Sequence, residues 1–174
     1  MRKVVLYIAM SLDGYIADKK GGVEWLQGDA SAPESEGSYP VFYESIDTIL
    51  IGYKTYQQIV TSLSPGSWVY TGKKTYVCTS RDLESHDGIT FTPENIEVII
   101  ERLKQELSLD IWICGGASIA QALIKADLID CYRITIVPCL LGGGISLFAD
   151  TAKELKLIST THTNGFVELF YERR

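Results

Sequence analysis

The sequence has few of the residues that build metal centres or disulfide frameworks. Among its 174 residues are four cysteines, without any C-x-x-C spacing, and two histidines, His86 and His162. Structural zinc sites need several Cys or His ligands at short spacings, and disulfide frameworks belong to short secreted chains rich in cysteine. We therefore expect no bound metal, and we expect the cysteines to be small buried apolar side chains.

Basic surface and long hydrophobic runs are missing as well. The formal net charge is -6 and the pI is about 4.9, whereas a surface for duplex nucleic acid needs a concentrated basic patch. The apolar start of the chain, residues 4–10, is too short to span a bilayer and lacks the small-residue cleavage site of a secretory signal. The sequence therefore predicts a cytoplasmic protein that binds neither nucleic acid nor a membrane.

The composition is that of one globular domain. Apolar residues make up 46% of the chain and charged residues 22%, and no repeat, Pro/Ser/Gly-rich linker or run of like charges divides it. A chain of 174 residues is long enough to bury one sizeable core. We assign residues 1–174 to a single domain.

Short apolar runs rich in β-branched residues predict the strands of a parallel sheet. Such runs precede polar or Gly-containing turns at residues 4–10, 48–51, 75–78 and 111–114. The last run is wholly apolar, as expected of a strand that is buried on both faces.

Helical patterns lie between these runs. The clearest begins with Thr92 as the expected N-cap and Pro93 at the first helical position. Its core-facing stripe at helical spacing comprises Ile96, Ile99, Ile100, Leu103 and Leu107. Further helices are predicted after Gly52 and over residues 118–126.

The last third of the chain predicts an antiparallel hairpin. Residues 131–137, 155–163 and 166–171 have the composition of longer strands, and Asn164-Gly165 stands between the last two. Asn-Gly between two strand-like runs is the strongest short hairpin signal. The expected fold class is therefore α/β, with a mostly parallel mixed sheet and a C-terminal antiparallel hairpin.

Three of the predicted strands end in turns suited to phosphate groups, at residues 52–55, 79–81 and 115–118. In the third turn, Gly115-Gly116 lets a phosphate approach the backbone, and a helix whose first amides are free begins directly afterwards. A Gly-Gly turn can also serve tight packing alone, but three such turns favour a dinucleotide site. The Rossmann pattern G-x-G-x-x-G is absent, and residues 66–74 do not have the spacing of a P-loop.

Ser80 and Arg81 favour NADP over NAD. A hydroxyl and a guanidinium can hold the 2′-phosphate of the adenosine ribose, whereas an NAD site places a carboxylate on the free 2′-hydroxyl. Asp82 is the next residue, so NAD stays open as an alternative at this point.

Together these segments resemble the dihydrofolate reductase superfamily, and more closely the branch that includes the reductase domain of riboflavin biosynthesis. Residues 9–17, A-M-S-L-D-G-Y-I-A, are similar to S-L-D-G-x-I-A of that branch, and residues 138–148 are similar to its P-x-L-L-G-x-G-x-x-L-F run. The resemblance runs nearly end to end and implies a three-layer α/β/α fold. It also implies that Ala9 and Ile16 flank the nicotinamide and the reducible ring.

The family's first cofactor turn has a counterpart at residues 52–56, which resemble G-[RK]-x-T-[WY]. In that pattern the Thr and the basic residue bind cofactor phosphates. The resemblance therefore implies that Gly52 and Thr55 belong to the cofactor site. Tyr53 replaces the usual basic residue, which leaves Lys54 as the candidate cation.

Two more cofactor turns follow. Ser80 and Arg81 match the family's 2′-phosphate loop, and residues 112–119 match its pyrophosphate turn. The family has a cis peptide bond between the two glycines of the second turn, so we expect one here. The residues that this match assigns to the cofactor site are Gly115, Gly116, Ala117, Ser118 and Ile119.

The resemblance implies an NADPH-dependent reductase that transfers a hydride to a pterin or aminopyrimidine-type substrate, with Thr135 as a substrate contact. Trp25 is a further candidate for substrate binding. In folate reduction a carboxylate assists protonation of the ring. Glu36 is our first candidate for it and Glu24 the second, while Asp13, at a turn, is expected mainly to shape the loop over the nicotinamide.

Partners and alternatives complete the expectations. A homodimer is expected from family analogy and from the apolar residues 134–141. The zinc deaminase motifs H-x-E and P-C-x-x-C, which accompany the reductase in the bifunctional riboflavin protein, are absent. The alternatives are a catalytically inactive NADP-binding regulatory protein and a protein–protein module whose glycine turns are purely structural.

Overall fold

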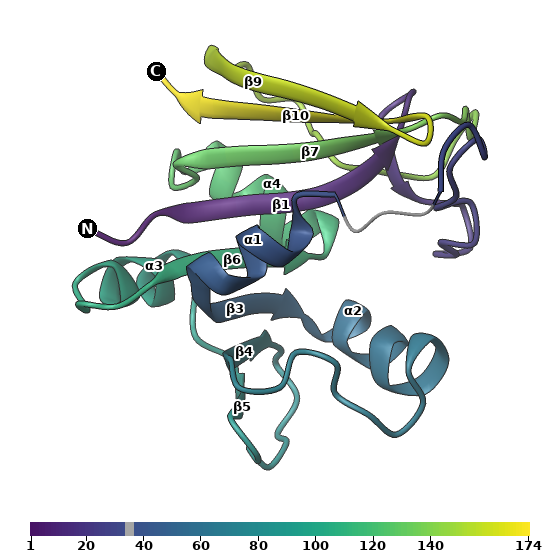
Figure 1. Ribbon diagram of the computed structural model, residues 1–174. Helices are drawn as coiled ribbons and strands as arrows, with labels where there is room; N and C mark the ends of the chain where they lie inside the picture. The colour runs from purple at the N-terminus through teal and green to yellow at the C-terminus, as the bar shows by residue number, and fades with distance from the viewer. Residues whose placement is uncertain (34–36) are drawn as a thin grey trace.

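The computed structural model describes residues 1–33 and 37–174. An eight-stranded sheet forms the centre of the molecule (Figure 1). The strand order is β5-β4-β3-β6-β1-β7-β10-β9. The strands are β1 (Val4–Ser11), β3 (Ile46–Gly52), β4 (Lys74–Cys78), β5 (Ile89–Thr92), β6 (Asp110–Gly115), β7 (Cys131–Val137), β9 (Leu155–Thr163) and β10 (Phe166–Arg173). Neighbours from β5 to β7 are parallel, and β10 is antiparallel to β7 and β9. The predicted mixed sheet is confirmed.

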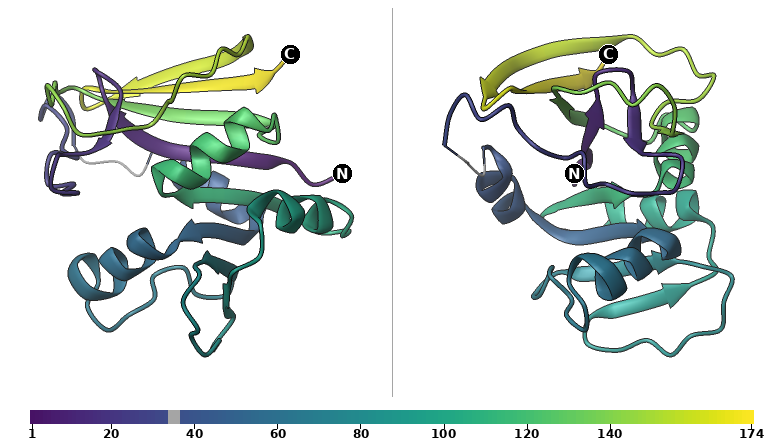
Figure 2. Two further views of the ribbon diagram at one scale, coloured as in Figure 1. Left: turned by 180° about the vertical axis from the view of Figure 1, so that it is seen from behind. Right: turned by 90° about the vertical axis from the view of Figure 1, so that its right-hand side faces the viewer.

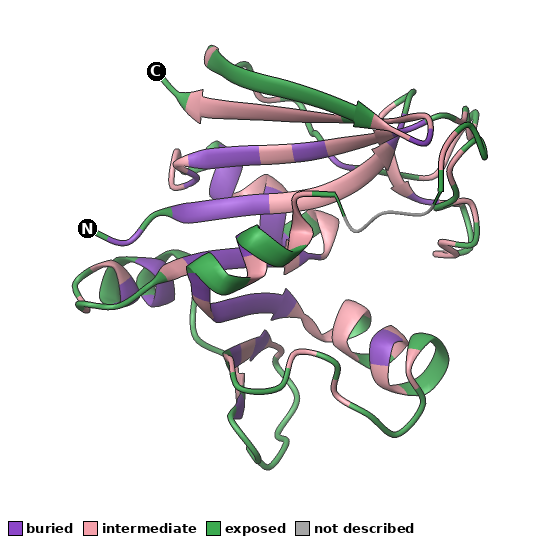
Figure 3. Ribbon diagram, viewed as in Figure 1, coloured by how far each residue is buried: buried purple, intermediate pink, exposed green. Residues whose placement is uncertain are grey.

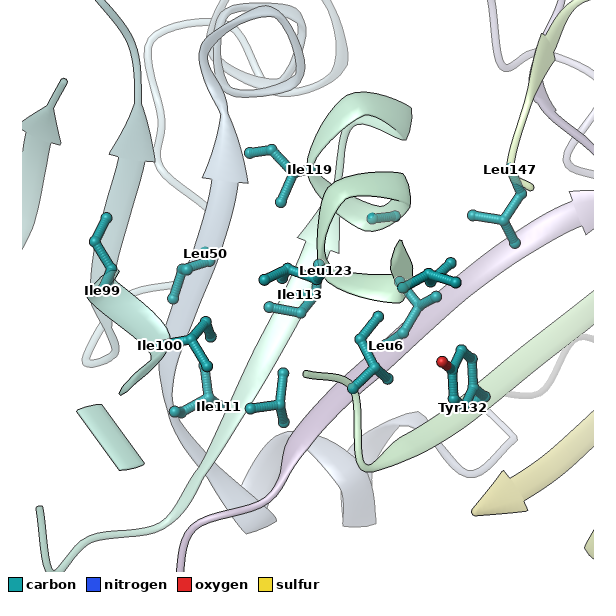
Figure 4. Close-up of a cluster of buried hydrophobic side chains, with 14 of the residues drawn as sticks. Leu6, Leu50, Ile99, Ile100, Ile111, Ile113, Ile119, Leu123, Tyr132 and Leu147 are labelled. Carbon is teal, nitrogen blue, oxygen red and sulfur yellow. The ribbon is translucent and has the colours of Figure 1, made fainter. Parts of the chain in front are cut away.

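The central strands lie inside because apolar side chains point to both of their faces. Val5 and Trp112 pack on one face. Leu6 and Leu50 pack on the other, where they meet the apolar sides of two helices (Figure 4). A strand that is buried on both faces offers no polar side chain along its length, so its chemistry is confined to its ends.

Helices cover both faces of the sheet. On one face lie α3 (Ile96–Lys104) and α4 (Ala117–Lys125), which the left view of Figure 2 shows in front of the sheet. The opposite face is covered by α1 (Tyr39–Ser45), which lies in front of the sheet in Figure 1. Phe42 anchors α1 by stacking on Tyr7 of β1, with ring centroids 4.4 Å apart. The three-layer α/β/α fold class is confirmed.

A fourth helical segment begins where β3 ends. It consists of α2 (Tyr53–Gln58) and a π-helical turn, Ile59–Leu63. Ile59 and Tyr53 of this segment pack with Ile51 of β3 and Val77 of β4. The segment therefore stands at the carboxyl edge of the parallel strands.

The C-terminal hairpin forms as the Asn-Gly signal predicts. Asn164 and Gly165 have φ angles of 50° and 77°, the left-handed pair that a two-residue hairpin turn of this type requires. The hairpin places β9 at the edge of the sheet, where most of its residues are exposed (Figure 3).

Three short strands were not predicted: β5, at one edge of the main sheet, and two strands that form a sheet of their own. β2 (Tyr15–Ala17) pairs with β8 (Ile145–Ser146) in a separate two-stranded sheet. This pairing brings the S-L-D-G segment beside the segment at residues 138–148. The two stretches that carry the riboflavin-branch resemblance are therefore neighbours in space.

The predicted start of α3 was wrong. Thr92 is the last residue of β5, and its backbone oxygen accepts a hydrogen bond from Thr79 N. The N-cap is Asn95, whose side chain accepts a hydrogen bond from Glu97 N at 2.7 Å. Because the helix ends at Lys104, Leu107 lies beyond it and is fully exposed, so its place in the core stripe was also wrong.

The segment that suggested a homodimer is divided between core and surface. Ile134 and Val137 are buried within the chain itself, and Leu140 is 70% exposed. The homodimer stays a prediction. Across residues 1–33 and 37–174, no helix has the length and apolar character that crossing a membrane requires.

Leu103 and Leu107 form a matched pair for testing this core. Leu103 is fully buried and Leu107 fully exposed, although both belong to the same predicted stripe. We expect Leu103→Ala to lower the free energy of unfolding by about 2–5 kcal/mol, because it opens a cavity. Leu107→Ala should change it by less than about 0.5 kcal/mol. Urea unfolding followed by circular dichroism measures both, and equal losses would contradict the described end of α3.

Candidate functional site

A cavity of about 1390 Å³ opens at the carboxyl ends of the parallel strands. The turns after β3, β4 and β6 line it together with residues of β1 and β2. All residues predicted to bind the cofactor lie in this lining: Ala9, Ile16, Gly52, Lys54, Thr55, Ser80, Arg81, Gly115, Gly116, Ala117, Ser118 and Ile119. Glycine turns that serve packing alone would leave the strand ends filled, so the open cavity argues against the purely structural alternative.

The Gly115-Gly116 turn joins β6 to α4. Both glycines have positive φ angles, 152° and 65°, and a Cβ on Gly116 would lie 3.5 Å from Thr55 Oγ1. Gly116 is the N-cap of α4 and supplies no side-chain cap, so the amides of Ala117 and Ser118 are open to a ligand, whereas Ile119 N already donates to Gly116 O at 3.1 Å. A helix N-terminus of this kind attracts anions.

The cis peptide bond expected between these glycines is not present. No peptide bond is cis in the described residues, so this expectation was wrong. The positive φ angles of Gly115 and Gly116 turn the chain from strand into helix with a trans bond between them.

The second cofactor turn follows β4. Arg81 N donates a hydrogen bond to Thr79 Oγ1 at 3.1 Å, which shapes the turn, and the Arg81 side chain is exposed. Its guanidinium carbon lies 4.7 Å from the centre of the Tyr53 ring, across the cavity rim. Lys54 is exposed in the first turn of α2.

All charged residues in the described lining of the cavity are positively charged. Among the described residues it contains four cations, Lys19, Lys20, Lys54 and Arg81, and neither Asp nor Glu. The whole chain has a formal net charge of -6, so this concentration of positive charge is local. Such a lining favours an anionic ligand.

The floor of the cavity is apolar and neutral. Cys114 and Tyr70 both line it, and Cys114 Sγ donates a hydrogen bond to the Tyr70 hydroxyl at 3.6 Å. Burial raises the pKa of the Cys114 thiol to about 12, so the thiol stays protonated at neutral pH. A protonated, buried thiol is a poor nucleophile, which leaves binding and orientation as the functions of this floor.

Neither of the two predicted carboxylates that the structure describes, Glu24 and Asp13, belongs to the cavity lining. Glu36 falls outside the described residues, and Glu24 is exposed on the loop after β2. Asp13 accepts hydrogen bonds from Ser11 Oγ and from the amides of Leu141 and Gly142, at 2.6, 3.1 and 2.8 Å. These bonds join the β1–β2 turn to the segment at residues 138–148.

The predicted substrate contacts are also outside the lining. Trp25 is half-buried in its own loop, where its Nε1 donates a hydrogen bond to Gly22 O at 3.1 Å. Thr135 lies on β7, opposite Ala9 of β1 in register. Since Ala9 does line the cavity, Thr135 is one strand away from it.

Glu168 of β10 is a carboxylate that the sequence analysis missed. It lies opposite Thr135 in register, its side chain is only 14% exposed, and it accepts a hydrogen bond from Ser38 Oγ at 2.5 Å. Arg133 Nη1 is 3.6 Å from its Oε1. The available signal was a lone acidic residue between apolar neighbours in the run F-V-E-L-F.

Comparison with known proteins places these features in a family. The model of the RibD C-terminal domain matches residues 55–167. The protein YwjB of Bacillus subtilis (strain 168) is 40% identical over 177 residues, which cover 99% of this chain and 98% of YwjB. YyaP of the same organism is 33% identical over 182 residues, covering 98% of this chain and 94% of YyaP.

Solved structures agree in fold. A Shewanella sp. PV-4 protein assigned to riboflavin biosynthesis is 28% identical with a TM-score of 0.86, and the match covers 99% of both chains. A Thermotoga maritima protein, titled as a diaminohydroxyphosphoribosylaminopyrimidine deaminase and 5-amino-6-(5-phosphoribosylamino)uracil reductase, is 15% identical with a TM-score of 0.71. The match covers 99% of this chain and 57% of that protein, and this likeness concerns the fold alone.

The Asp13 hydrogen bonds predict an acid-sensitive contribution to stability. The bond from Ser11, with those from the Leu141 and Gly142 amides, holds the pKa of Asp13 below its ordinary value. A carboxyl group whose pKa is lower in the folded state than in the unfolded state stabilises the protein at pH values above the unfolded-state pKa of about 3.9. This stabilisation is lost as the pH falls through the folded-state pKa. We expect the unfolding temperature of wild type to fall more steeply than that of Asp13→Asn between neutral and acid pH. Thermal unfolding measures this, with the exposed Asp82→Asn as control, and parallel curves for wild type and Asp13→Asn would contradict it.

Proposed function

The chain belongs to the RibD C-terminal domain family, and on this premise we propose that it is an NADPH-dependent reductase of a pterin or aminopyrimidine-type substrate. The observation that carries the proposal is the convergence of three strand-end turns on one cavity with a cationic lining. The reductase-like fold of the relatives supports the same reaction class.

The residues present fit a phosphorylated dinucleotide. Gly116 leaves room beside Thr55 Oγ1 that a Cβ would fill, and the free amides of the first turn of α4 suit a pyrophosphate. Arg81 and Ser80 suit a 2′-phosphate, which needs a charged and a neutral hydrogen-bond donor. When bound, NADPH supplies the hydride.

The apolar part of the lining holds the reacting groups away from water. Ala9 and Ile16 line the cavity from β1 and β2, and Val23, Leu26 and Ile59 line it from the loop and from the π-helical turn. Apolar walls orient a planar ring without competing for its polar atoms, and they exclude water that would intercept the reaction.

We assign the role of the substrate-side carboxylate to Glu168. It is buried next to Thr135 on the face of the sheet that α1 covers, and Ser38 and Arg133 hold its position. Arg133 Nη1 lies 3.6 Å from Glu168 Oε1, so the two side chains form an ion pair in this half-buried place. Glu168 lies outside the cavity lining, one strand beyond Thr135, so the proposed contact requires a substrate ring that reaches from the cavity past Thr135. The Glu168 carboxylate can then accept a hydrogen bond from the polar edge of that ring.

A second candidate function is an NADP-binding protein without turnover. It is favoured by the described cavity lining, which contains no carboxylate that could assist protonation of a substrate. The two candidates share the cofactor site and differ in chemistry, so separate experiments test them.

Binding of NADPH tests the shared part. We expect wild type to bind NADPH at least about 10-fold more tightly than NADH in calorimetry, because Arg81 meets the 2′-phosphate. Gly116→Ala should weaken NADPH binding by about 10-fold, since the added methyl group lies beside Thr55 at a positive φ. Gly72→Ala is the matched control, because Gly72 has a φ of 79° and a Cβ added there would meet nothing within 4 Å. Equal binding of both nucleotides, or of neither, would refute the cofactor assignment.

Turnover separates the two candidate functions. We expect NADPH oxidation with 5-amino-6-(5-phosphoribosylamino)uracil to exceed that with dihydrofolate, because Lys19 and Lys20 provide cationic lining for a substrate phosphate. Glu168→Gln should lower kcat/KM by about 100-fold and leave the Kd of NADPH unchanged. Glu172→Gln, on the same strand but paired with Lys3, is the control. NADPH binding without oxidation of any pterin or pyrimidine would establish the second candidate instead.

A further inference from the structure

Tyr53 occupies the position where the first cofactor turn of the dihydrofolate reductase superfamily carries a basic residue. It is the first residue of α2 and directly follows Gly52, the last residue of β3. Gly52 lies opposite Cys78 in the β3–β4 ladder, so the turns that carry Tyr53 and Arg81 leave the sheet side by side. Both residues line the cavity.

The Tyr53 ring is held by the protein on its inner side. It packs against the cluster of Ile51, Ile59 and Val77, and its centroid lies 6.3 Å from that of Tyr56. Tyr53 is half-buried, whereas Arg81 is exposed. The packed Tyr53 ring can therefore support the exposed side chain of Arg81, which has fewer contacts of its own to hold it.

The Arg81 guanidinium lies over this ring, with its central carbon 4.7 Å from the centroid. A cation within about 6 Å of a ring centre is attracted by the negative face of the ring. Stacking uses the flat face of the guanidinium and leaves its N–H edge free, and that edge is the part that binds a phosphate with two parallel hydrogen bonds.

Tyr53 therefore adds no second positive charge to this part of the site. Its ring instead supports the positively charged side chain of Arg81. An exposed arginine without a partner samples many rotamers, and ordering it on ligand binding reduces affinity. An arginine that is already stacked has lost part of that freedom before the ligand arrives. The benefit applies only to a ligand that the guanidinium touches.

We propose that Tyr53 is a specificity-determining positioning residue that holds Arg81 ready for a 2′-phosphate and thereby sets the preference for NADPH over NADH. This inference rests on the proposed function, because it requires a dinucleotide in the cavity. It predicts that the Tyr53 ring matters for NADPH through Arg81 and matters little for NADH, which has no 2′-phosphate.

The test is a double-mutant cycle read by calorimetry with NADPH and NADH. Tyr53→Leu should weaken NADPH binding by about 2- to 5-fold, the strength of an exposed cation–π contact, and leave NADH binding unchanged. Tyr53→Phe keeps the ring and should retain the wild-type ratio of the two affinities. In the Arg81→Ala background, Tyr53→Leu should cause no further loss of NADPH affinity.

Each other outcome decides against the inference or against its premise. Equal weakening of NADPH and NADH by Tyr53→Leu, or additive losses in the cycle, would overturn the positioning role. Tight NADPH binding that Tyr53→Leu leaves unchanged would overturn the inference and keep the proposed function. Wild type that binds neither nucleotide would overturn the proposed function itself. Tyr53→Gln is carried through the same cycle as a second ring-free variant, and 2′,5′-ADP against 5′-ADP isolates the phosphate contribution.

Discussion

The parallel ladder of β3, β6 and β1 is the constraint on which the rest of the structure depends. The middle of β3 and of β6 is buried on both faces and apolar, so the side chains that can meet a ligand lie at the ends of these strands. Because they run in one direction, their carboxyl ends meet at one edge of the sheet. Ile51 lies opposite Gly115 in register, so the turns after β3 and β6 leave the sheet together and bring Thr55 beside Gly116. The cavity follows from this alignment.

Charge then determines which ligand the cavity favours. The chain is acidic overall, yet the described lining carries only cations among its charged residues. The cations are contributed by loops and by the first turn of α2, and neutral groups such as the protonated thiol of Cys114 complete the lining. A ligand with phosphates at one end and a planar ring at the other matches this distribution. The preference for one dinucleotide over another is then decided at the rim, where Tyr53 supports Arg81.

Much of this fold could be predicted from the sequence because its signals are local. The apolar runs, the Asn164-Gly165 turn and the glycine turn at residues 115–116 each act within a few residues, and each is where it was expected. The start of α3 was missed because Thr92 and Asn95 are both good caps, and the choice depends on pairing of β5 with β4, which is not local. The pairing of β2 with β8 depends equally on distant contacts.

The difference between local and distant signals also explains why the cofactor side of the site could be predicted from the sequence and the proposed substrate side could not. The cofactor turns are contiguous stretches, so every residue predicted for them lines one cavity. The substrate side that we propose is assembled from separate elements, which contribute Ser38, Arg133 and Glu168, and no spacing in the sequence reveals such a group. Glu24 and Trp25 were chosen for their chemistry alone, and the structure places both in a loop outside the cavity lining.

The central claim is that three separate turns form one dinucleotide site. Amide hydrogen exchange with and without NADPH tests it most directly, because it reports on each turn in a single experiment. The account predicts simultaneous protection at residues 52–57, 79–81 and 115–119. Protection confined to one turn, or found only in a separate cavity of about 680 Å³ lined by Trp68 and His86, would contradict it.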